Sequence, residues 1–263
     1  MIFMIFVLIA LLILTSVFLF RKRKPTVKDA GLDNLLSSNF LDEHVAFMQE
    51  LTADERIVFH QKLDDFLACV TITGVDTIVT PEDKLLIAAG AVIPIFRFAN
   101  WKYYNLKEVL VYSDAINTNF QSVEGTERDI LGMVGSGYME GKMLLSKPAL
   151  ELGFANKSDK RNTVIHEFVH LIDKLDGDTD GVPELLLQKQ YVLPWLDMIH
   201  KEMEKIRTGE SDIDVYGYTN KTEFFAVAAE YFFERPDLFR DKHPQLYGLM
   251  QRMFEPPGRI SGE

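Results

Sequence analysis

The sequence is nearly devoid of cysteine: one residue, Cys69, occurs among 263. An intramolecular disulfide is therefore excluded, and a lone cysteine is compatible with a reducing compartment. We expect Cys69 to be a small buried apolar residue near a helix end rather than a nucleophile. A chain of this length needs no disulfide, because it can bury a sizeable core of its own.

Positive charge is also scarce. Lys and Arg number 28 against 39 Asp and Glu, which gives a net charge of −11. The strongly basic cluster is confined to residues 21–24. Because phosphate binding relies on clustered Lys and Arg, this composition argues against direct binding of nucleic acid. The chain also lacks internal repeats and low-complexity tracts, so we predict one large domain at residues 39–263.

A long apolar run occurs at residues 2–20, where Thr15 and Ser16 are the only polar residues. As a helix this run would extend over about 28 Å, close to the hydrocarbon thickness of a bilayer. A signal peptide would carry its basic residues before the run, whereas here they follow it. We therefore predict one transmembrane helix at 1–20 and a basic juxtamembrane linker at 21–38. The positive-inside rule then places the domain in the cytoplasm, with an exported domain as the alternative.

Helix signals outnumber strand signals in the rest of the chain. Capping boxes, prolines and apolar periodicity predict helices at residues 52–70, 80–91, 183–207 and 220–234. Strands are predicted at 108–113 and as a pair within 131–146, and Gly74 marks a turn. The expected fold class is α+β, mainly helical, with a small sheet.

A His-Glu-x-x-His motif begins at His166, inside a stretch that is apolar on almost every side. We expect a buried helix here, with Ser158 as its N-cap and Gly177 as its C-cap. His166 and His170 are one turn apart, so their rings can direct nitrogen atoms at a single Zn²⁺ ion. Glu167 can then reach a water molecule on that ion. The motif indicates zinc-dependent peptide hydrolysis, and the alternative is a chance match.

A catalytic zinc ion needs a third protein ligand and one open position. His200 and His243 are candidates, but each stands alone on a helix face that we expect to be solvated. Glu223 begins a strongly apolar helix, where an unpaired carboxylate would be costly. With Asn220 as N-cap, however, Glu223 also occupies the third position of a capping box. Spacing alone leaves both interpretations of Glu223 open.

Two further acidic residues lie on the same two apolar helices. Glu230 is two turns after Glu223, and Asp173 is one turn after His170. Ligating histidines usually donate their second ring N–H group to a carboxylate or a carbonyl oxygen. Glu230 and Asp173 are therefore candidates for orienting the two histidines.

Several motifs in combination resemble the Mlc titration factor A family of bacterial zinc peptidases. The resemblance covers most of residues 40–250, and the segments that carry it are Thr80–Ala89, Val109–Tyr112, Val164–Asp173, Gly177, Asp180–Pro183, Tyr216, Glu223–Val227 and Glu230–Phe233. The resemblance implies a zincin-like catalytic core similar to that of anthrax lethal factor. Such a core has two His and one Glu as zinc ligands, a Glu as base, and a Tyr seven residues before the ligand Glu. In this sequence the pattern falls on His166, His170, Glu223, Glu167 and Tyr216.

The predicted function is a zinc-dependent peptidase, gluzincin-like in its ligands, with one catalytic Zn²⁺ ion and a peptide or protein substrate. Tyr216 would donate a hydrogen bond to the oxyanion that forms from the scissile carbonyl group, and Tyr218 is the alternative candidate for this role. The strand near residues 143–146 would pair with the substrate backbone. The predicted location is the bacterial cytoplasmic membrane, crossed once.

A membrane-tethered regulatory protein is the competing interpretation. Such a protein would capture a transcriptional repressor, and its peptidase site would be vestigial or secondary. The resemblance alone implies this regulator as a partner. A structural zinc site is normally closed by four protein ligands that commonly include cysteine. The chain offers only Cys69, which favours the catalytic interpretation.

Overall fold

The computed structural model describes residues 30–36, 38–116, 130–156 and 159–255, nearly all of which belong to one compact unit, Gly31–Glu263. Within these ranges, no helix combines the length and the apolar composition that crossing a membrane requires. The predicted transmembrane helix at 1–20 and most of the linker at 21–38 lie outside the described residues. The membrane anchor therefore stays a prediction.

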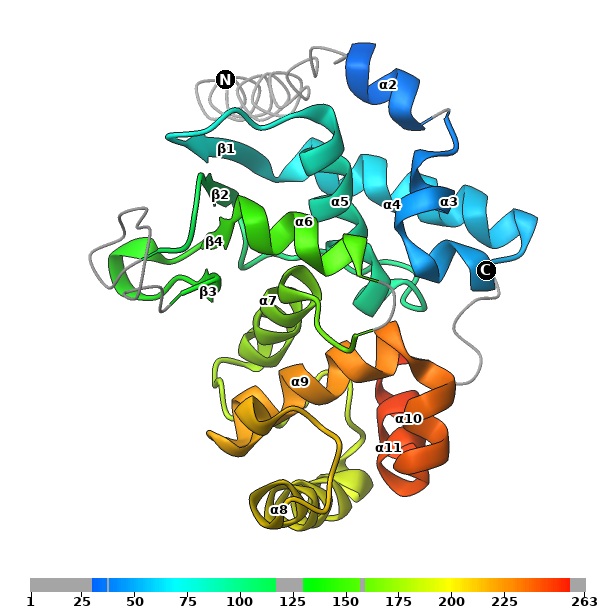
Figure 1. The fold of residues 1–263 in the computed structure, drawn as a ribbon, viewed down its shortest axis with the longest axis vertical. Coiled ribbons are helices and arrows are strands. Elements are labelled where there is room, and N and C mark those ends of the chain that lie inside the picture. The colour runs from blue at the N-terminus through cyan, green and yellow to red at the C-terminus, as the bar shows by residue number, and fades with distance from the viewer. Residues whose placement is uncertain (1–29, 37, 117–129, 157–158, 256–263) are drawn as a thin grey trace, which may run out of the picture. The chain divides into compact units, whose positions relative to one another are not determined.

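Helices make up most of the described chain (Figure 1). They are α2 (Ala30–Leu36), α3 (Phe40–His44), α4 (Ala53–Cys69), α5 (Pro81–Val92), α6 (Lys147–Ala155), α7 (Thr163–Asp173), α8 (Val192–Thr208), α9 (Lys221–Glu234), α10 (Pro236–Lys242) and α11 (Pro244–Phe254). Thr52 and Thr80 form the predicted capping boxes of α4 and α5, and Asn220 caps α9. Local capping chemistry therefore explains where these three helices begin.

Two predictions about helices are wrong. The helix expected over 183–207 begins only at Val192, which places Pro194 in its first turn, where a missing N–H group costs nothing. Cys69 is exposed rather than buried, because it is the last residue of α4 and faces solvent.

The four strands form one mixed sheet in the order β1-β2-β4-β3. Their bounds are β1 (Thr71–Val75), β2 (Glu108–Tyr112), β3 (Gly132–Val134) and β4 (Lys142–Ser146). β1, β2 and β4 are parallel, whereas β3 runs antiparallel to β4 at the edge. The strand at 108–113 and the strand pair within 131–146 are confirmed.

Gly74 lies inside β1 and not in the predicted turn. It pairs with Val111 of β2, so pairing between distant segments overrides the local preference of glycine. The chain also turns back closely after the strand: a Cβ atom at Gly74 would lie 2.1 Å from the carbonyl oxygen of Thr77. Only glycine fits at this position without a shift of the backbone.

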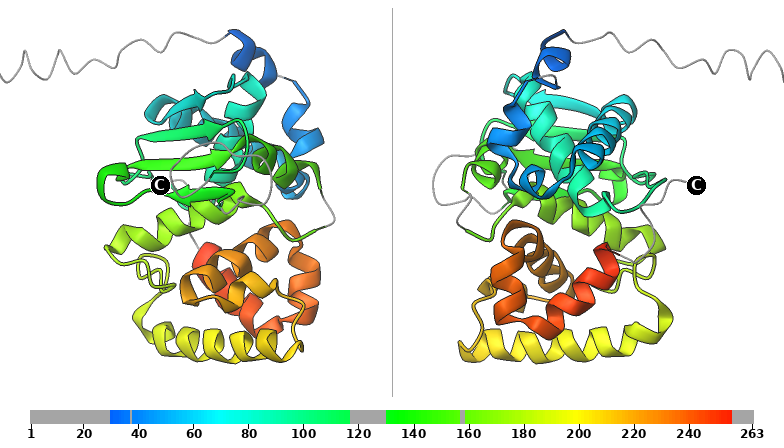
Figure 2. Two further views of the ribbon diagram at one scale, coloured as in Figure 1. Left: turned by 60° about the vertical axis from the view of Figure 1, so that its left-hand side comes forward. Right: turned by 90° about the vertical axis from the view of Figure 1, so that its right-hand side faces the viewer.

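Helix α7 lies between the sheet and α9, and both views in Figure 2 show this layering. It contacts β3 and β4 on one side and α9 on the other. Every residue of α7 after Thr163 is buried, including both histidines of the motif. The mainly helical α+β class is confirmed, and it places the motif in the middle of the core.

Candidate metal centre

Asn162 caps the helix that carries the motif. Its side-chain oxygen accepts hydrogen bonds from the N–H groups of Val164 and Ile165, each at 3.2 Å. The prediction of Ser158 as N-cap is wrong, because α7 begins five residues later. Gly177 does end the 3-10 turn that extends α7, with a left-handed φ of 109°.

Three donor atoms converge in front of α7. His166 Nε2 lies 3.0 Å from His170 Nε2 and 3.0 Å from Glu223 Oε2, and His170 Nε2 lies 3.4 Å from the same oxygen. Zinc bonds of about 2.0–2.1 Å in tetrahedral geometry separate neighbouring ligand atoms by about 3.3 Å. The three groups therefore fit a zinc ion with little rearrangement. No other group of three potential ligands is found in the described part of the chain.

Glu223 takes part in a cap and in this cluster at the same time. Its backbone N–H group donates to the Asn220 side chain at 2.9 Å, as an N-terminal cap requires. Its carboxylate points to the two histidines. Burial acts to raise the pKa of Glu223, but hydrogen bonds from His166 and His170 outweigh it and lower the pKa to about 2. Glu223 is thus held as the anion that a zinc ligand must be.

The two alternative histidines lie elsewhere. His200 is exposed on α8, and His243 bonds Glu202 at 3.1 Å and Asp212 at 2.7 Å. Neither belongs to the cluster. The structure therefore leaves Glu223 as the third candidate ligand.

Glu230 orients the ring of His166. One of its carboxylate oxygens lies 2.6 Å from His166 Nδ1, and the other accepts the backbone N–H of Asn162 at 2.6 Å. This contact directs Nε2 of the ring toward the cluster. Burial alone would lower the pKa of His166, but Glu230 and Glu223 raise it well above its ordinary value. The local field of these carboxylates favours a cation at the cluster.

Asp173, the other predicted orienting residue, makes a different contact. It is fully buried, and its Oδ2 atom accepts the N–H of Gly181 at 2.9 Å. Burial raises its pKa to about 6, although the Gly181 hydrogen bond acts against this. Asp173 Oδ1 and His170 Nδ1 are both buried, and neither has a hydrogen-bond partner among the described residues. A role for Asp173 toward His170 stays a prediction.

Glu167 packs directly against the edge strand β3. A Cβ atom at Gly132 would lie 2.6 Å from Glu167 Cγ and 2.7 Å from its Oε1 atom. Only glycine at this point of the strand lets the carboxyl group occupy its place. Burial raises the pKa of Glu167, with Glu223 and Glu230 adding to the rise and the two histidines opposing it. The raised pKa makes Glu167 a stronger base than an exposed carboxylate.

The outer edge of β3 faces the cluster. The backbone N–H of Ser146 donates to the carbonyl oxygen of Leu131 at 2.8 Å. Because backbone groups alternate along an antiparallel ladder, those of Gly132 and Val134 point away from β4. The strand at 143–146, predicted to pair with a substrate, has β2 on one side and β3 on the other. That prediction is wrong, because both edges of β4 are occupied.

Two cavities of about 340 and 390 Å³ lie beside the cluster. They share Gly132, His166, Glu167 and Tyr216 as lining residues. The proposed base and one candidate ligand therefore face both cavities. Volumes of this size are typical of ligand sites.

Tyr216 lies in the short 3-10 helix η6 (Val215–Tyr218), with its ring centroid 6.1 Å from that of His166. Burial raises its pKa, and Glu223 and Glu167 add to the rise, so the phenol stays protonated and can donate a hydrogen bond. Tyr216 lines both cavities, whereas Tyr218 lines neither. The geometry thus favours Tyr216 over its rival.

The comparison with known proteins agrees with this geometry. A family described as glucose-regulated metallo-peptidase M90 matches residues 19–255. The chain belongs to this family. Mlc titration factor A of Escherichia fergusonii is 29% identical over 235 residues, which cover 81% of this chain and 84% of that protein. The same factor of Pectobacterium atrosepticum is 26% identical over 214 residues, covering 74% and 78%. An uncharacterised protein of Synechocystis is 29% identical over 224 residues, covering 81% of each chain.

The predicted resemblance is thereby confirmed.

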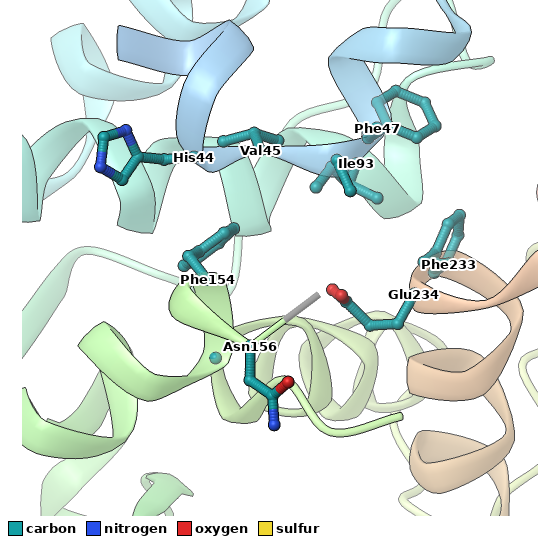
Figure 3. Close-up of a pocket in the computed structure, with 10 residues that line it drawn as sticks. His44, Val45, Phe47, Ile93, Phe154, Asn156, Phe233 and Glu234 are labelled. Atoms are coloured by element: carbon teal, nitrogen blue, oxygen red, sulfur yellow. The ribbon is translucent and has the colours of Figure 1, made fainter. Parts of the chain in front are cut away.

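This member of the metallo-peptidase family has a further small cavity between α6 and α9. Figure 3 shows the Glu234 carboxylate directed into it, with Ile93 and Phe154 facing it. Burial raises the pKa of Glu234 to about 7, although a hydrogen bond from Asn162 at 3.0 Å acts against this. The cavity holds only about 10 Å³, room for about one water molecule, so it cannot receive a peptide.

Three contributors to the candidate metal centre escaped sequence reasoning. Asn162 offered a signal, since it is a preferred N-cap residue placed directly before the apolar run. Gly132 offered a weaker one, because an isolated glycine in a strand marks a close approach of another group. The position of β3 at the edge of the sheet, among the described strands, depends on strand order, for which the sequence carried no signal.

Proposed function

We propose that the chain is a zinc-dependent peptidase in which His166, His170 and Glu223 hold one Zn²⁺ ion. The observation that carries this proposal is the convergence of three donor atoms at 3.0–3.4 Å beside two cavities. Membership of a metallo-peptidase family supports it. The substrate class is an extended peptide or protein segment.

Zinc, when bound, would activate a water molecule and polarise the scissile carbonyl group. Glu167, with its raised pKa, would take the proton of that water and pass it to the leaving amine. Tyr216 would donate its phenolic hydrogen to the developing oxyanion. The outward backbone groups of Gly132 and Val134 would hydrogen-bond the substrate backbone and hold it along β3.

The direct test uses the full chain purified in detergent. We expect about one zinc ion per chain, peptide hydrolysis seen as new fragments by mass spectrometry, loss of hydrolysis with a chelator, and recovery when zinc is restored. A preparation that binds zinc but never hydrolyses a peptide library would contradict the peptidase proposal. Hydrolysis that survives complete removal of metal would contradict the mechanism.

Gly132→Ala tests the space that β3 leaves for the base. We expect turnover to fall about 10- to 100-fold while zinc content stays constant, because the added methyl group displaces the Glu167 carboxylate. Gly248→Ala is the matched control, since a Cβ atom there meets nothing within 4 Å. Turnover, metal content and melting temperature are measured on the same samples. Wild-type turnover in a folded Gly132→Ala protein would refute this account.

We also propose that residues 1–20 anchor the peptidase domain, residues 39–263, to the bacterial cytoplasmic membrane. The apolar run followed by four basic residues supports a single span with the domain in the cytoplasm. A reporter active only in the cytoplasm, fused after Glu263, should be active. Activity of an export-dependent reporter at the same position would reverse the proposed orientation.

The name of the relatives, Mlc titration factor A, supports a regulatory protein as a second kind of partner. We propose this partner, and the alternative function as a repressor-capturing scaffold, on the family resemblance together with that name. Capture of a purified transcriptional regulator by a variant unable to hydrolyse peptides would separate binding from hydrolysis. Absence of binding in that assay would remove the scaffold function.

A further inference from the structure

Three consecutive residues before α7 contact other parts of the candidate site. Lys160 Nζ donates to the backbone oxygen of Asp212 at 2.6 Å and to its Oδ2 atom at 2.7 Å. Arg161 Nε donates to Asp214 Oδ2 at 2.7 Å. The next residue, Asn162, donates its N–H to Glu230, which in turn orients the candidate ligand His166.

The two aspartates lie directly before the turn that carries Tyr216. Asp214 is the N-cap of η6, and its Oδ1 atom accepts the backbone N–H of Tyr216 at 2.9 Å. The backbone oxygen of Asp214 accepts the N–H of Gly217 at 3.0 Å. One carboxylate thus contacts both Arg161 and the backbone of Tyr216, which links the start of α7 to the Tyr216 turn.

Asp212 is held from its other side as well. His243 Nε2 lies 2.7 Å from Asp212 Oδ1, and the Tyr231 hydroxyl donates to Oδ2 at 2.9 Å. Burial acts to raise the pKa of Asp212, but hydrogen bonds from Lys160, His243 and Tyr231 lower it well below its ordinary value. Asp212 therefore stays ionised and joins α9 and the end of α10 to the segment before Tyr216.

We propose that the ion pairs Lys160–Asp212 and Arg161–Asp214 form a clamp that positions the Tyr216 hydroxyl relative to the metal ligands. The clamp residues act through Tyr216 and are positioning residues. This inference rests on the proposed function, in which Tyr216 stabilises the oxyanion. The Arg161 side chain is 72% exposed, and exposed ion pairs contribute little to stability, so its removal leaves the fold intact.

Lys160, Arg161 and Asp214 also line the 340 Å³ cavity, where cations could bind an anionic group of a substrate. Both cations, however, already bond a carboxylate of the protein. A substrate would have to displace Asp212 or Asp214 and would disturb the Tyr216 turn. The geometry therefore favours positioning over substrate binding, and the two roles predict different kinetics.

The test is a double-mutant cycle between Arg161→Gln and Tyr216→Phe in the full chain. We expect Arg161→Gln to lower kcat about tenfold and to change KM less than about twofold. The misplaced Tyr216 hydroxyl would stabilise the oxyanion of the transition state less well, whereas binding of the substrate does not use this hydrogen bond. In the Tyr216→Phe background the same change should alter kcat less than about twofold, since no hydroxyl remains to be positioned. Arg161→Lys should restore most of the loss. Arg240→Gln, which removes an exposed pair with Asp237, is the matched control and should change nothing.

An equal loss of kcat from Arg161→Gln in the wild-type and Tyr216→Phe backgrounds would overturn the clamp. A raised KM with unchanged kcat would also overturn it, because Arg161 would then bind the substrate. Hydrogen exchange supplies a readout without activity: amides of residues 212–218 should exchange faster in Arg161→Gln than in the wild type or in Arg240→Gln. Unchanged exchange overturns the clamp even if the protein hydrolyses peptides. Faster exchange in a protein without any hydrolysis would support the clamp while refuting the proposed function.

Discussion

Replacement of Glu167 by Gln is expected to leave zinc bound and to abolish nearly all peptide hydrolysis. Gln has the same shape and fits the space beside Gly132, and His166, His170 and Glu223 all remain. No group is then placed to take the proton of the attacking water, so turnover should fall by about 10²- to 10⁴-fold. Metal content and turnover are measured on one sample.

Glu204→Gln is the control for this experiment, because Glu204 is exposed on α8 and its one ion pair among the described residues is with Arg207, three residues further along the helix. It should hydrolyse peptides at the wild-type rate. Unchanged turnover in Glu167→Gln with full zinc occupancy would refute the role of Glu167 as base. Loss of zinc would instead show that the carboxylate supports the metal site directly.

Glu223→Gln is expected to weaken zinc binding by at least about tenfold, because a neutral amide replaces an anionic oxygen beside a dication. The bound comes from groups that only orient a ligand, whose loss already lowers metal affinity by about 10- to 100-fold. The cap should survive, since it uses the backbone N–H of Glu223 and the side chain of Asn220. Competition with a chelator, compared between wild type and variant, measures the affinity.

Asn220→Ala separates the two roles of this helix end. It removes the cap and should cost about 1 kcal/mol of stability while zinc affinity stays close to that of the wild type. If Glu223→Gln instead retains zinc as tightly as the wild type and only Asn220→Ala destabilises the protein, Glu223 is a capping residue and not a ligand.

Local chemistry made several elements predictable. Thr52 and Thr80 determine where α4 and α5 begin, because a capping box involves only residues three apart. His166 and His170 face the same point because helical geometry alone brings residues four apart together. The resemblance added Glu223, 53 residues further along the chain, which neither spacing nor capping could separate from a structural residue.

Other features depended on segments far apart in the sequence. Gly74 has the local preference of a turn, but it lies in β1 because Val111 of β2 pairs with it. Among the described strands β3 rather than β4 lies at the edge, because strand order is decided by packing of the whole sheet. Both residues predicted to orient a histidine are buried acids; Glu230 bonds His166, whereas Asp173 accepts a hydrogen bond from Gly181 and its role toward His170 stays a prediction.

The sequence by itself determined the His-Glu-x-x-His motif, the helical class and the two histidine ligand candidates, since these follow from residue types and from spacings within a few helical turns. Only the tertiary structure decided how Asn162 joins α7 to Glu230, how Gly132 makes room for Glu167, and how Arg161 connects to the Tyr216 turn. Each of these contacts joins segments 30 to 70 residues apart. Such contacts form only when the apolar faces of α7, α9 and the sheet pack together, and no local preference encodes them.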